Sequence, residues 1–208
     1  GATDVGLWVT KFMRPITPAV FIGHLNPLQS IEIDEVGVTL GAGVTYSQFT
    51  ETIARYFPQM DAFWSRIGGE QVRNMGTIGG NIANGSPIGD TPPALIALWA
   101  TITLRQGKQQ RTLPLQDYFI AYGQQDRQPG EFLESIHIPF LNADDHFAVH
   151  KISKRRDEDI SSVCGSFRIS LKGNTVASVV IAFGGMAATP KRAATADAVL
   201  LGQGWNQT

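Results

Sequence analysis

Residues 73–90 read RNMGTIGGNIANGSPIGD, a stretch in which closely spaced glycines are combined with Thr, Asn, Ser and Asp. Glycine permits a positive φ and a close approach of the backbone to a ligand, so consecutive N–H groups can converge on phosphate oxygens. Short hydroxyl and amide side chains add further donors. The stretch therefore predicts a cradle for a diphosphate, and a purely structural run of glycine turns is the alternative that composition leaves open.

The glycine spacing matches neither the dinucleotide pattern G-x-G-x-x-G nor a P-loop that ends in Gly-Lys-Ser/Thr, so those two binding modes do not apply. Glycines and prolines extend over residues 68–93, which predicts one long structured loop. Loops of this length are usually functional or disordered. Apolar residues within it would anchor the loop and favour order: Met75, Ile78, Ile82 and Ile88.

The flanking sequence predicts short strands and short amphipathic helices. Runs of β-branched residues indicate hairpins and single strands at 30–34 with 38–42, 101–105 with 110–113, and 132–138. Apolar residues at helical spacing predict helices over 47–57 and 58–67, and another over 94–100 that is entered through Pro92 and Pro93. A short apolar run lies at 19–22. The aromatic residues of the first two helices are interpreted as core.

A second pattern follows the polar segment 142–146. Strands are predicted at 147–152, 162–171 and 176–183, and a helix is predicted from Lys191, after Pro190. We therefore expect a domain boundary near residue 143, which divides the chain into residues 1–142 and 143–208.

Composition narrows the classes of function. The chain has 208 residues, 43% hydrophobic and 17% charged, with a net charge of −1, so it can bury a substantial core. The basic run 154–156 is followed directly by the acidic run 157–159, which argues against nucleic-acid binding. Neither a membrane-length apolar stretch nor an export signal is visible, so a cytoplasmic location is expected.

Cys164 is the single cysteine, which excludes an internal disulfide and an iron–sulfur cluster held by four thiolates of this chain. Any clusters must then belong to a partner. The four histidines show no spacing that indicates a metal site, and no hydrolytic triad or carboxylate pair stands out.

Residues 76–90 closely resemble the second FAD loop of the molybdenum hydroxylase flavoproteins, the family of the xanthine dehydrogenase FAD-binding subunit and the carbon monoxide dehydrogenase flavoprotein. Residues 1–6 (GATDVG) resemble the remaining half of that family's first FAD loop. Later family signatures are matched by FLESIHIP at 132–139, KISKRRDEDI at 151–160 and AFGGMAATPKR at 182–192. The resemblance covers nearly the whole chain.

The resemblance implies an α+β fold: part of an FAD-binding domain of the vanillyl-alcohol-oxidase (PCMH) type, followed by a smaller α/β C-terminal domain. It also implies that the chain is truncated at both ends. A strand before Gly1 and the end of the C-terminal domain would be absent, and we expect such a fragment to bind FAD weakly or not at all.

Site residues follow from the same match. The first loop would line the FAD diphosphate through Ala2, Thr3, Asp4 and Val5, although a ragged terminus is the competing reading. The second loop would hold the diphosphate and the ribityl chain through Thr77, Ile78, Gly79, Gly80 and Asn81.

The resemblance also implies roles for three further residues. Asp90 would lie on the adenosine side of FAD, or would act only as a carboxylate at a helix N-terminus. The backbone of Leu133 would meet the flavin ring. Lys151 would lie beside the pyrimidine end, where a cation stabilises reduced anionic flavin, or would be an ordinary strand-edge lysine. Ile67 stands where some relatives place an aromatic ring against the flavin. Residues 154–159 are either a mobile loop near the site where the electron acceptor binds or a solvated turn between two strands.

The function implied by the resemblance is electron transfer from iron–sulfur clusters through FAD to NAD+ in a molybdenum hydroxylase, with xanthine or hypoxanthine favoured as substrate. Iron–sulfur and molybdopterin units would be separate domains or subunits of an oligomer. Relatives that act on carbon monoxide, nicotinate or aldehydes share the same loops. An alternative of another class is a flavin-free assembly module that binds only partners.

Overall fold

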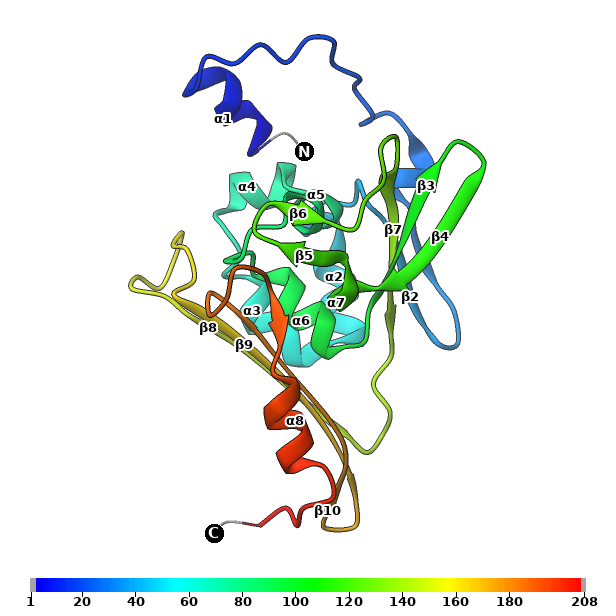
Figure 1. The fold of residues 1–208 in the computed structure, drawn as a ribbon, viewed down its shortest axis with the longest axis vertical. Helices are drawn as coiled ribbons and strands as arrows, with labels where there is room; N and C mark the ends of the chain where they lie inside the picture. Colours follow the sequence, from blue (N-terminus) through cyan, green and yellow to red (C-terminus); the bar gives the residue numbers. More distant parts are fainter. Residues whose placement is uncertain (1–2, 207–208) are drawn as a thin grey trace.

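The computed structural model describes residues 3–206 as an α+β fold with two antiparallel sheets and a helical layer between them (Figure 1). The helices α2, α3 and α6 occupy the centre of the view, with the five-stranded sheet on one side and the four-stranded sheet on the other. One core cluster joins residues of both sheets to these helices, including Leu40, Phe49, Trp64, Ile136 and Val180.

The first sheet has the order β1-β2-β7-β3-β4, and every neighbouring pair in it is antiparallel. Leu40 of β2 and Ile102 of β3 both face Ile136 of the central strand β7, and all three are fully buried. The predicted hairpins and the strand at 132–138 are confirmed by β1 (Ile31–Ile33), β2 (Gly37–Gly41), β3 (Thr101–Gln106), β4 (Gln109–Pro114) and β7 (Phe132–Pro139).

Short helices lie along the chain before β1 and between the strands of this sheet. α2 (Tyr46–Tyr56) begins with a capping box in which the Thr45 hydroxyl accepts from the Gln48 N–H and the Gln48 side chain accepts from the Thr45 N–H. The helix predicted over 58–67 is shorter than expected: η2 (Pro58–Met60) leads into α3 (Asp61–Trp64). The remaining small elements here are η1 (Asn26–Gln29), α7 (Leu115–Tyr118), β5 (Phe119–Ala121) and β6 (Gln124–Gln125).

The single long loop predicted over 68–93 is wrong, because this segment contains α4 (Glu70–Met75), α5 (Ile78–Asn84) and the start of α6 (Thr91–Ala97). Some of its glycines mark helix ends: Gly69 and Gly76 flank α4, and Gly85 follows α5. Gly85 ends α5 with a φ of 64°, a left-handed conformation that glycine adopts at low cost. α6 begins three residues before the predicted helix because Pro92 and Pro93 lie inside its first turn, where a missing N–H costs little.

The second sheet has the order β11-β10-β9-β8 and is also antiparallel. The three predicted strands are confirmed as β8 (Asp145–Ile152), β9 (Val163–Lys172) and β10 (Thr175–Gly184). The helix predicted from Lys191 begins later, since β11 (Lys191–Arg192) pairs with β10 before α8 (Ala194–Leu200) starts. α6 is buried along its whole length against β9 and β10, so it connects the two sheets.

The first described residues form α1 (Val5–Thr10), which has no buried residue. Figure 1 shows this helix beside the end of the molecule that carries α4 and α5. The apolar run at 19–22 belongs to no helix or strand, and Val20 and Phe21 are exposed. Within residues 3–206, no helix has both the length and the apolarity needed to cross a membrane.

Candidate functional site

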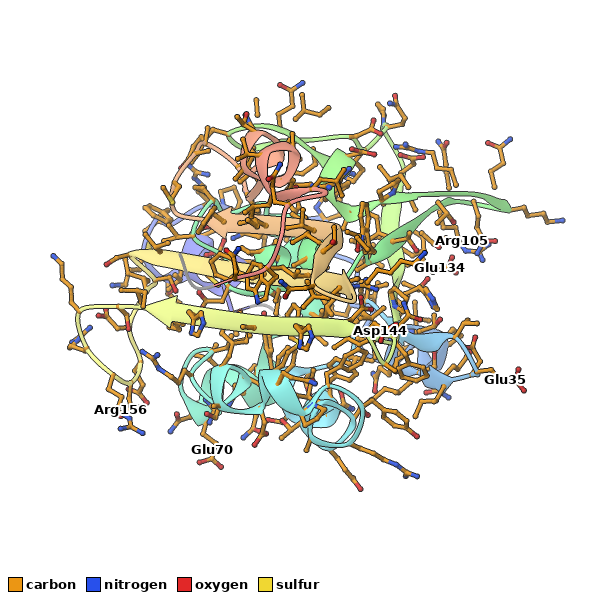
Figure 2. All side chains as sticks on the ribbon, turned by 90° about the horizontal axis from the view of Figure 1, so that it is seen from below. Glu35, Glu70, Arg105, Glu134, Asp144 and Arg156 are labelled. Atoms are coloured by element: carbon orange, nitrogen blue, oxygen red, sulfur yellow. The ribbon has the colours of Figure 1, made fainter. Side chains whose placement is uncertain are left out.

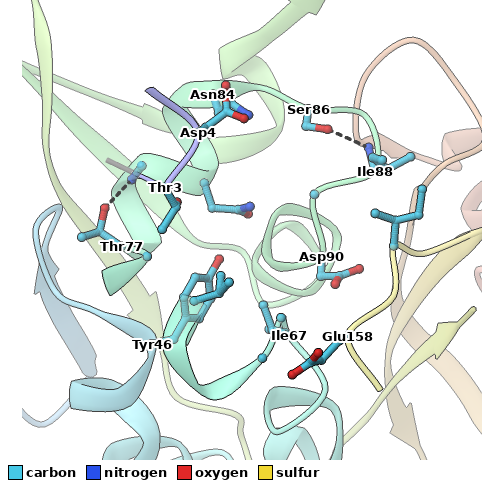
Figure 3. Close-up of a pocket in the computed structure, with 18 of the residues that line it drawn as sticks. Thr3, Asp4, Tyr46, Ile67, Thr77, Asn84, Ser86, Ile88, Asp90 and Glu158 are labelled. Carbon is cyan, nitrogen blue, oxygen red and sulfur yellow. Dashed lines mark hydrogen bonds between the residues drawn. The ribbon is translucent and has the colours of Figure 1, made fainter. Parts of the chain in front are cut away.

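A cleft of about 800 Å³ opens where α1, α5 and the segment before α6 meet the end of β8 (Figure 3). Its lining includes residues from both predicted FAD loops and from the second sheet. Figure 3 shows Thr3 and Asp4 on the same side as Thr77 and Asn84, with Asp90 and Glu158 across from them. The tertiary structure therefore brings three separate sequence segments to one cavity.

The first loop reaches this cleft through Thr3, Asp4 and Val5, and Val5 is also the first residue of α1. Ala2, the remaining residue predicted from this loop, lies outside the described residues. Trp8, one turn further along α1, joins the lining.

The second loop contributes Thr77, Gly80 and Asn81 to the lining, whereas Ile78 and Gly79 lie behind it and are buried. Thr77 is the N-cap of α5, and its hydroxyl accepts from the Gly80 N–H at 3.0 Å. The N–H groups of Ile78 and Gly79 donate to the carbonyls of Val44 and Ala42 at 3.0 and 3.1 Å. These two N–H groups therefore have protein acceptors, and the exposed side chains of the loop are the better placed donors.

Gly79 has a packing role of its own. A Cβ at this position would lie 2.4 Å from the Cβ of Ala42 and 2.5 Å from its carbonyl oxygen, far inside van der Waals contact. The absence of a side chain lets α5 pack directly on the turn that follows β2. Gly79 is thus required for the close packing of α5 on this turn, a role that the predicted run of glycine turns did not include.

Asp90 and Lys151 form a buried ion pair in the wall of the cleft, with Nζ and Oδ2 2.5 Å apart. Their side chains are 9% and 2% exposed. The Ser161 hydroxyl donates to the other carboxylate oxygen. Asp90 occupies the N-cap position of α6 but makes no side-chain capping bond. Lys151 does lie on the edge strand β8, yet it is not the solvated lysine that the simple alternative supposes.

The pairing changes how these two residues can be used. The resemblance places Asp90 on the adenosine side of FAD and Lys151 at the pyrimidine end of its ring, and in an extended FAD the ribityl and diphosphate groups separate those ends. Because the two side chains are in contact, both lie in one region of the cleft and cannot face the two separated ends of an extended FAD.

Two other predicted positions differ in their surroundings. Leu133 is 7% exposed, belongs to the central strand β7 and lies outside the residues that line the cleft. Ile67 does line the cleft and is 6% exposed, so an aliphatic side chain stands where some relatives have an aromatic ring.

The end of the charged segment 154–159 reaches the cleft, where Glu158 and Asp159 join the lining together with the next residue, Ile160. Arg66, which follows α3, holds this segment: Nη1 donates to the Lys151 carbonyl at 2.8 Å and Nε to the Arg156 carbonyl at 3.1 Å. Arg156 itself points outward at the tip of the segment (Figure 2). Arg66 was not predicted from sequence, because it lies 85 residues from Lys151.

Three buried residues at the site were also missed: Tyr46, Ser161 and Cys164. Burial raises the pKa of Tyr46 well above its ordinary value, with the Asp90 charge adding to the rise against a lowering by the Thr91 hydrogen bond. Burial likewise raises the pKa of the Cys164 thiol to about 12, and Asp90 adds to that rise. Both groups are therefore neutral near pH 7. No local pattern marks these residues, because long-range packing brings Tyr46 into the cleft lining and places Ser161 and Cys164 against Asp90.

The charges of the cleft are mostly negative. Its described lining contains Asp4, Asp90, Glu158 and Asp159 against the cation Lys151, which Asp90 already neutralises. Hydroxyl and amide donors would consequently carry much of the contact with a diphosphate. The described residues contain no group of three or more His, Cys, Asp or Glu side chains arranged to hold a metal ion.

Sequence comparison defines the family of the chain. Residues 1–141 match the family described as the FAD binding domain in molybdopterin dehydrogenase, and residues 148–208 match the CO dehydrogenase flavoprotein C-terminal domain. The chain therefore belongs to the flavoprotein family of the molybdopterin dehydrogenases, whose members are oxidoreductases. The predicted resemblance and the predicted fold class are confirmed.

Individual relatives agree with this membership. The chain is 28% identical to a xanthine dehydrogenase/oxidase of Gallus gallus over its whole length, which is 16% of that protein. It is 34% identical to the glyceraldehyde dehydrogenase medium chain of Sulfolobus acidocaldarius, with 89% of this chain and 66% of that one covered.

A solved carbon monoxide dehydrogenase from Hydrogenophaga pseudoflava, which lacks the Mo-pyranopterin moiety of its cofactor, superimposes with a TM-score of 0.81 at 28% identity. The match covers 88% of this chain and 64% of that one. The chain thus spans about a sixth of the xanthine dehydrogenase relative and just under two thirds of the glyceraldehyde dehydrogenase medium chain and of the carbon monoxide dehydrogenase chain.

Proposed function

We propose that the cleft between the two loops binds FAD and that the chain is the flavin-carrying part of a molybdenum hydroxylase. The observation that supports this most directly is the convergence of Thr3, Thr77 and Asn81 on one cavity from two loops about 70 residues apart. Its volume of about 800 Å³ lies within the usual range of roughly 300–1,000 Å³ for cofactor sites.

The donor set fits the cofactor. The hydroxyls of Thr3, Thr77 and Ser86 and the amides of Asn81 and Asn84 line the cavity and can donate to phosphate oxygens and to ribityl hydroxyls. Leu133 and Ile78 would support the ring and the loop from behind rather than contact the diphosphate. When bound, FAD supplies redox chemistry that no side chain here can provide.

The protein's own part is to position the flavin and limit water. Burial of Tyr46 and Ile67 in the cleft wall excludes water from its floor. Asp90 holds the Lys151 ammonium at a fixed place in the wall, so the pair presents an oriented dipole to a bound cofactor rather than a net positive charge. The end of segment 154–159 reaches the same end of the cleft, which favours its interpretation as a loop near the site where the electron acceptor binds.

The finer assignments complete the proposal. Electrons would come from iron–sulfur clusters and a molybdopterin centre in partner domains or subunits of an oligomer, and NAD+ would accept them. Xanthine or hypoxanthine is the favoured substrate, which places the whole enzyme in purine metabolism and in the cytoplasm. The division into residues 1–142 and 143–208 is proposed with it, since the strands of the first sheet end at Pro139 and those of the second begin at Asp145.

The test is equilibrium dialysis of the purified chain against FAD up to the millimolar range, with bound flavin measured by its visible absorbance. We expect saturable binding, weaker than sub-micromolar. If no flavin is retained at any concentration, the chain is the flavin-free assembly module instead. For the finer assignment, the assembled enzyme supplied with xanthine should produce NADH, and reduction of dyes without NADH would exclude NAD+ as the acceptor.

A further inference from the structure

Three side chains are joined by hydrogen bonds: Tyr46 in the cleft wall, the buried Thr91, and Asn81, which also lines the cleft. The Tyr46 hydroxyl lies 3.4 Å from the Thr91 Oγ1, and the Thr91 hydroxyl donates to the Asn81 Oδ1. Tyr46 and Thr91 are 3% and 0% exposed, whereas Asn81 is half-buried and lines the cleft. The three residues come from the starts of α2 and α6 and from the middle of α5.

The number of hydroxyl protons on Tyr46 and Thr91 determines which group donates in each of these hydrogen bonds. Thr91 has one hydroxyl proton and gives it to Asn81 Oδ1, so the contact with Tyr46 requires the phenol to donate. In the reverse direction Asn81 would donate to Thr91 and Thr91 to Tyr46. The buried phenolic proton would then have no acceptor among the hydrogen bonds of residues 3–206, which is costly. Burial keeps Tyr46 protonated and thus able to donate.

Because the donor in each of these hydrogen bonds is determined, the orientation of the Asn81 carboxamide is determined too. Its oxygen is used by Thr91, so its NH2 group is the part left for the cleft. The carboxamide lies beside Gly89, where an added Cβ would be 3.3 Å from Oδ1 and 3.5 Å from Nδ2, so the hydrogen bond from Thr91 is what fixes its orientation. We propose that Thr91 and Tyr46 are positioning residues that hold the Asn81 NH2 toward the cleft, where it donates to a phosphate oxygen of the FAD diphosphate.

This assignment rests on the proposed function and makes it more specific. A flexible asparagine could present either its oxygen or its NH2, and the oxygen would repel a phosphate. In a cleft whose charges are mostly negative, a neutral donor held in one orientation distinguishes an anionic group from a cationic one. The geometry thus gives Thr91, which lies outside the cleft lining, a role in recognition of the diphosphate, and Tyr46 supports Thr91 in that role.

A double-mutant cycle of FAD affinity, measured by equilibrium dialysis of the full chain, tests the positioning role. Thr91→Val keeps the shape of the side chain and removes the donor, and we expect about tenfold weaker binding. Thr91→Ser should restore affinity to within about twofold. In an Asn81→Ala background Thr91→Val should have almost no further effect, because the group that it positions is gone. Thr103→Val, which removes a hydroxyl of β3 in a Thr103–Thr112 contact remote from the cleft, is the matched control.

Asn81→Asp tests the orientation itself. It keeps the acceptor for Thr91 and replaces the NH2 by a charged oxygen, so binding should weaken more than in Asn81→Ala, by about a hundredfold relative to the unchanged chain. Equal or tighter binding by Asn81→Asp would show that the carboxamide is turned the other way. A full Thr91→Val effect in the Asn81→Ala background would overturn the positioning role alone, while absence of FAD binding by the unchanged chain would overturn the proposed function and this role together.

Discussion

Lys151 Nζ lies 2.5 Å from Asp90 Oδ2, and this contact joins the edge strand of the second sheet to the start of the helix that packs between the sheets. The sequence separation is 61 residues, and both charges are almost completely buried. A buried ion pair of this kind adds modest net stability, but removal of one member leaves an uncompensated charge.

Asp90→Ala is therefore expected to lower the free energy of unfolding by about 3–5 kcal/mol, as measured by urea denaturation. The double variant Asp90→Ala/Lys151→Met should recover part of that loss, since no unpaired charge remains. Arg155→Ala removes an ion pair in which the arginine is 76% exposed, and a change below about 0.5 kcal/mol is expected there. A double variant as unstable as Asp90→Ala would contradict the explanation.

Acid stability should depend on Glu131. Hydrogen bonds from Arg111 and from the Gln128 N–H lower the pKa of Glu131 from 4.5 to about 2. A carboxylate with a depressed folded-state pKa contributes stability that is present above the unfolded value and is lost as pH falls through the folded value. The unfolding free energy should thus fall between about pH 4.5 and pH 2.

Glu131→Gln should flatten the dependence over this range, with thermal unfolding at a series of pH values as the measurement. The control is Glu51→Gln, at an exposed position of α2. An unchanged slope in Glu131→Gln would show that other carboxylates determine the acid response.

Gly79→Ala should destabilise the fold by about 1–3 kcal/mol in urea denaturation, because the added methyl group would overlap Ala42 and force α5 away from the turn after β2. Gly23→Ala provides a comparison, since a Cβ at Gly23 meets nothing within 4 Å. Equal effects of the two substitutions would mean that α5 can move without cost and that Gly79 is not required for packing.

The Cys164 thiol should resist modification in the folded protein. It is 1% exposed, it donates to the Asp90 carbonyl at 3.6 Å, and burial raises its pKa to about 12, so the reactive thiolate is scarce. A thiol reagent at pH 8 should react fully only after denaturation. Ser162→Cys, at an exposed position two residues away, should add one thiol that reacts rapidly in the native state. Rapid labelling of the unchanged protein would reveal frequent local opening around β9.

Much of the fold could be predicted because its strands are marked by local patterns. β-Branched runs locate β1–β4 and β7–β10 to within two residues, and apolar spacing over 47–57 locates α2 to within one. Prediction failed in residues 68–93, where glycines suggest a loop but helices form. α5 survives its two internal glycines because Thr77 caps it and Ile78 and Ile82 are buried in the core. Tertiary burial there outweighs the low helix propensity of glycine.

The sequence by itself determined the family, the strand pattern and the segments that supply the site, because these depend on local composition and on motifs such as residues 76–90. Only the tertiary structure decided how those segments meet. It paired Asp90 with Lys151 and left Ile78, Gly79 and Leu133 outside the cleft lining. It also brought Tyr46 into that lining and placed Arg66 against the backbone of Lys151 and Arg156. Such relationships join residues 45 to 90 positions apart. They arise from packing of the helices between the two sheets, which no local pattern encodes.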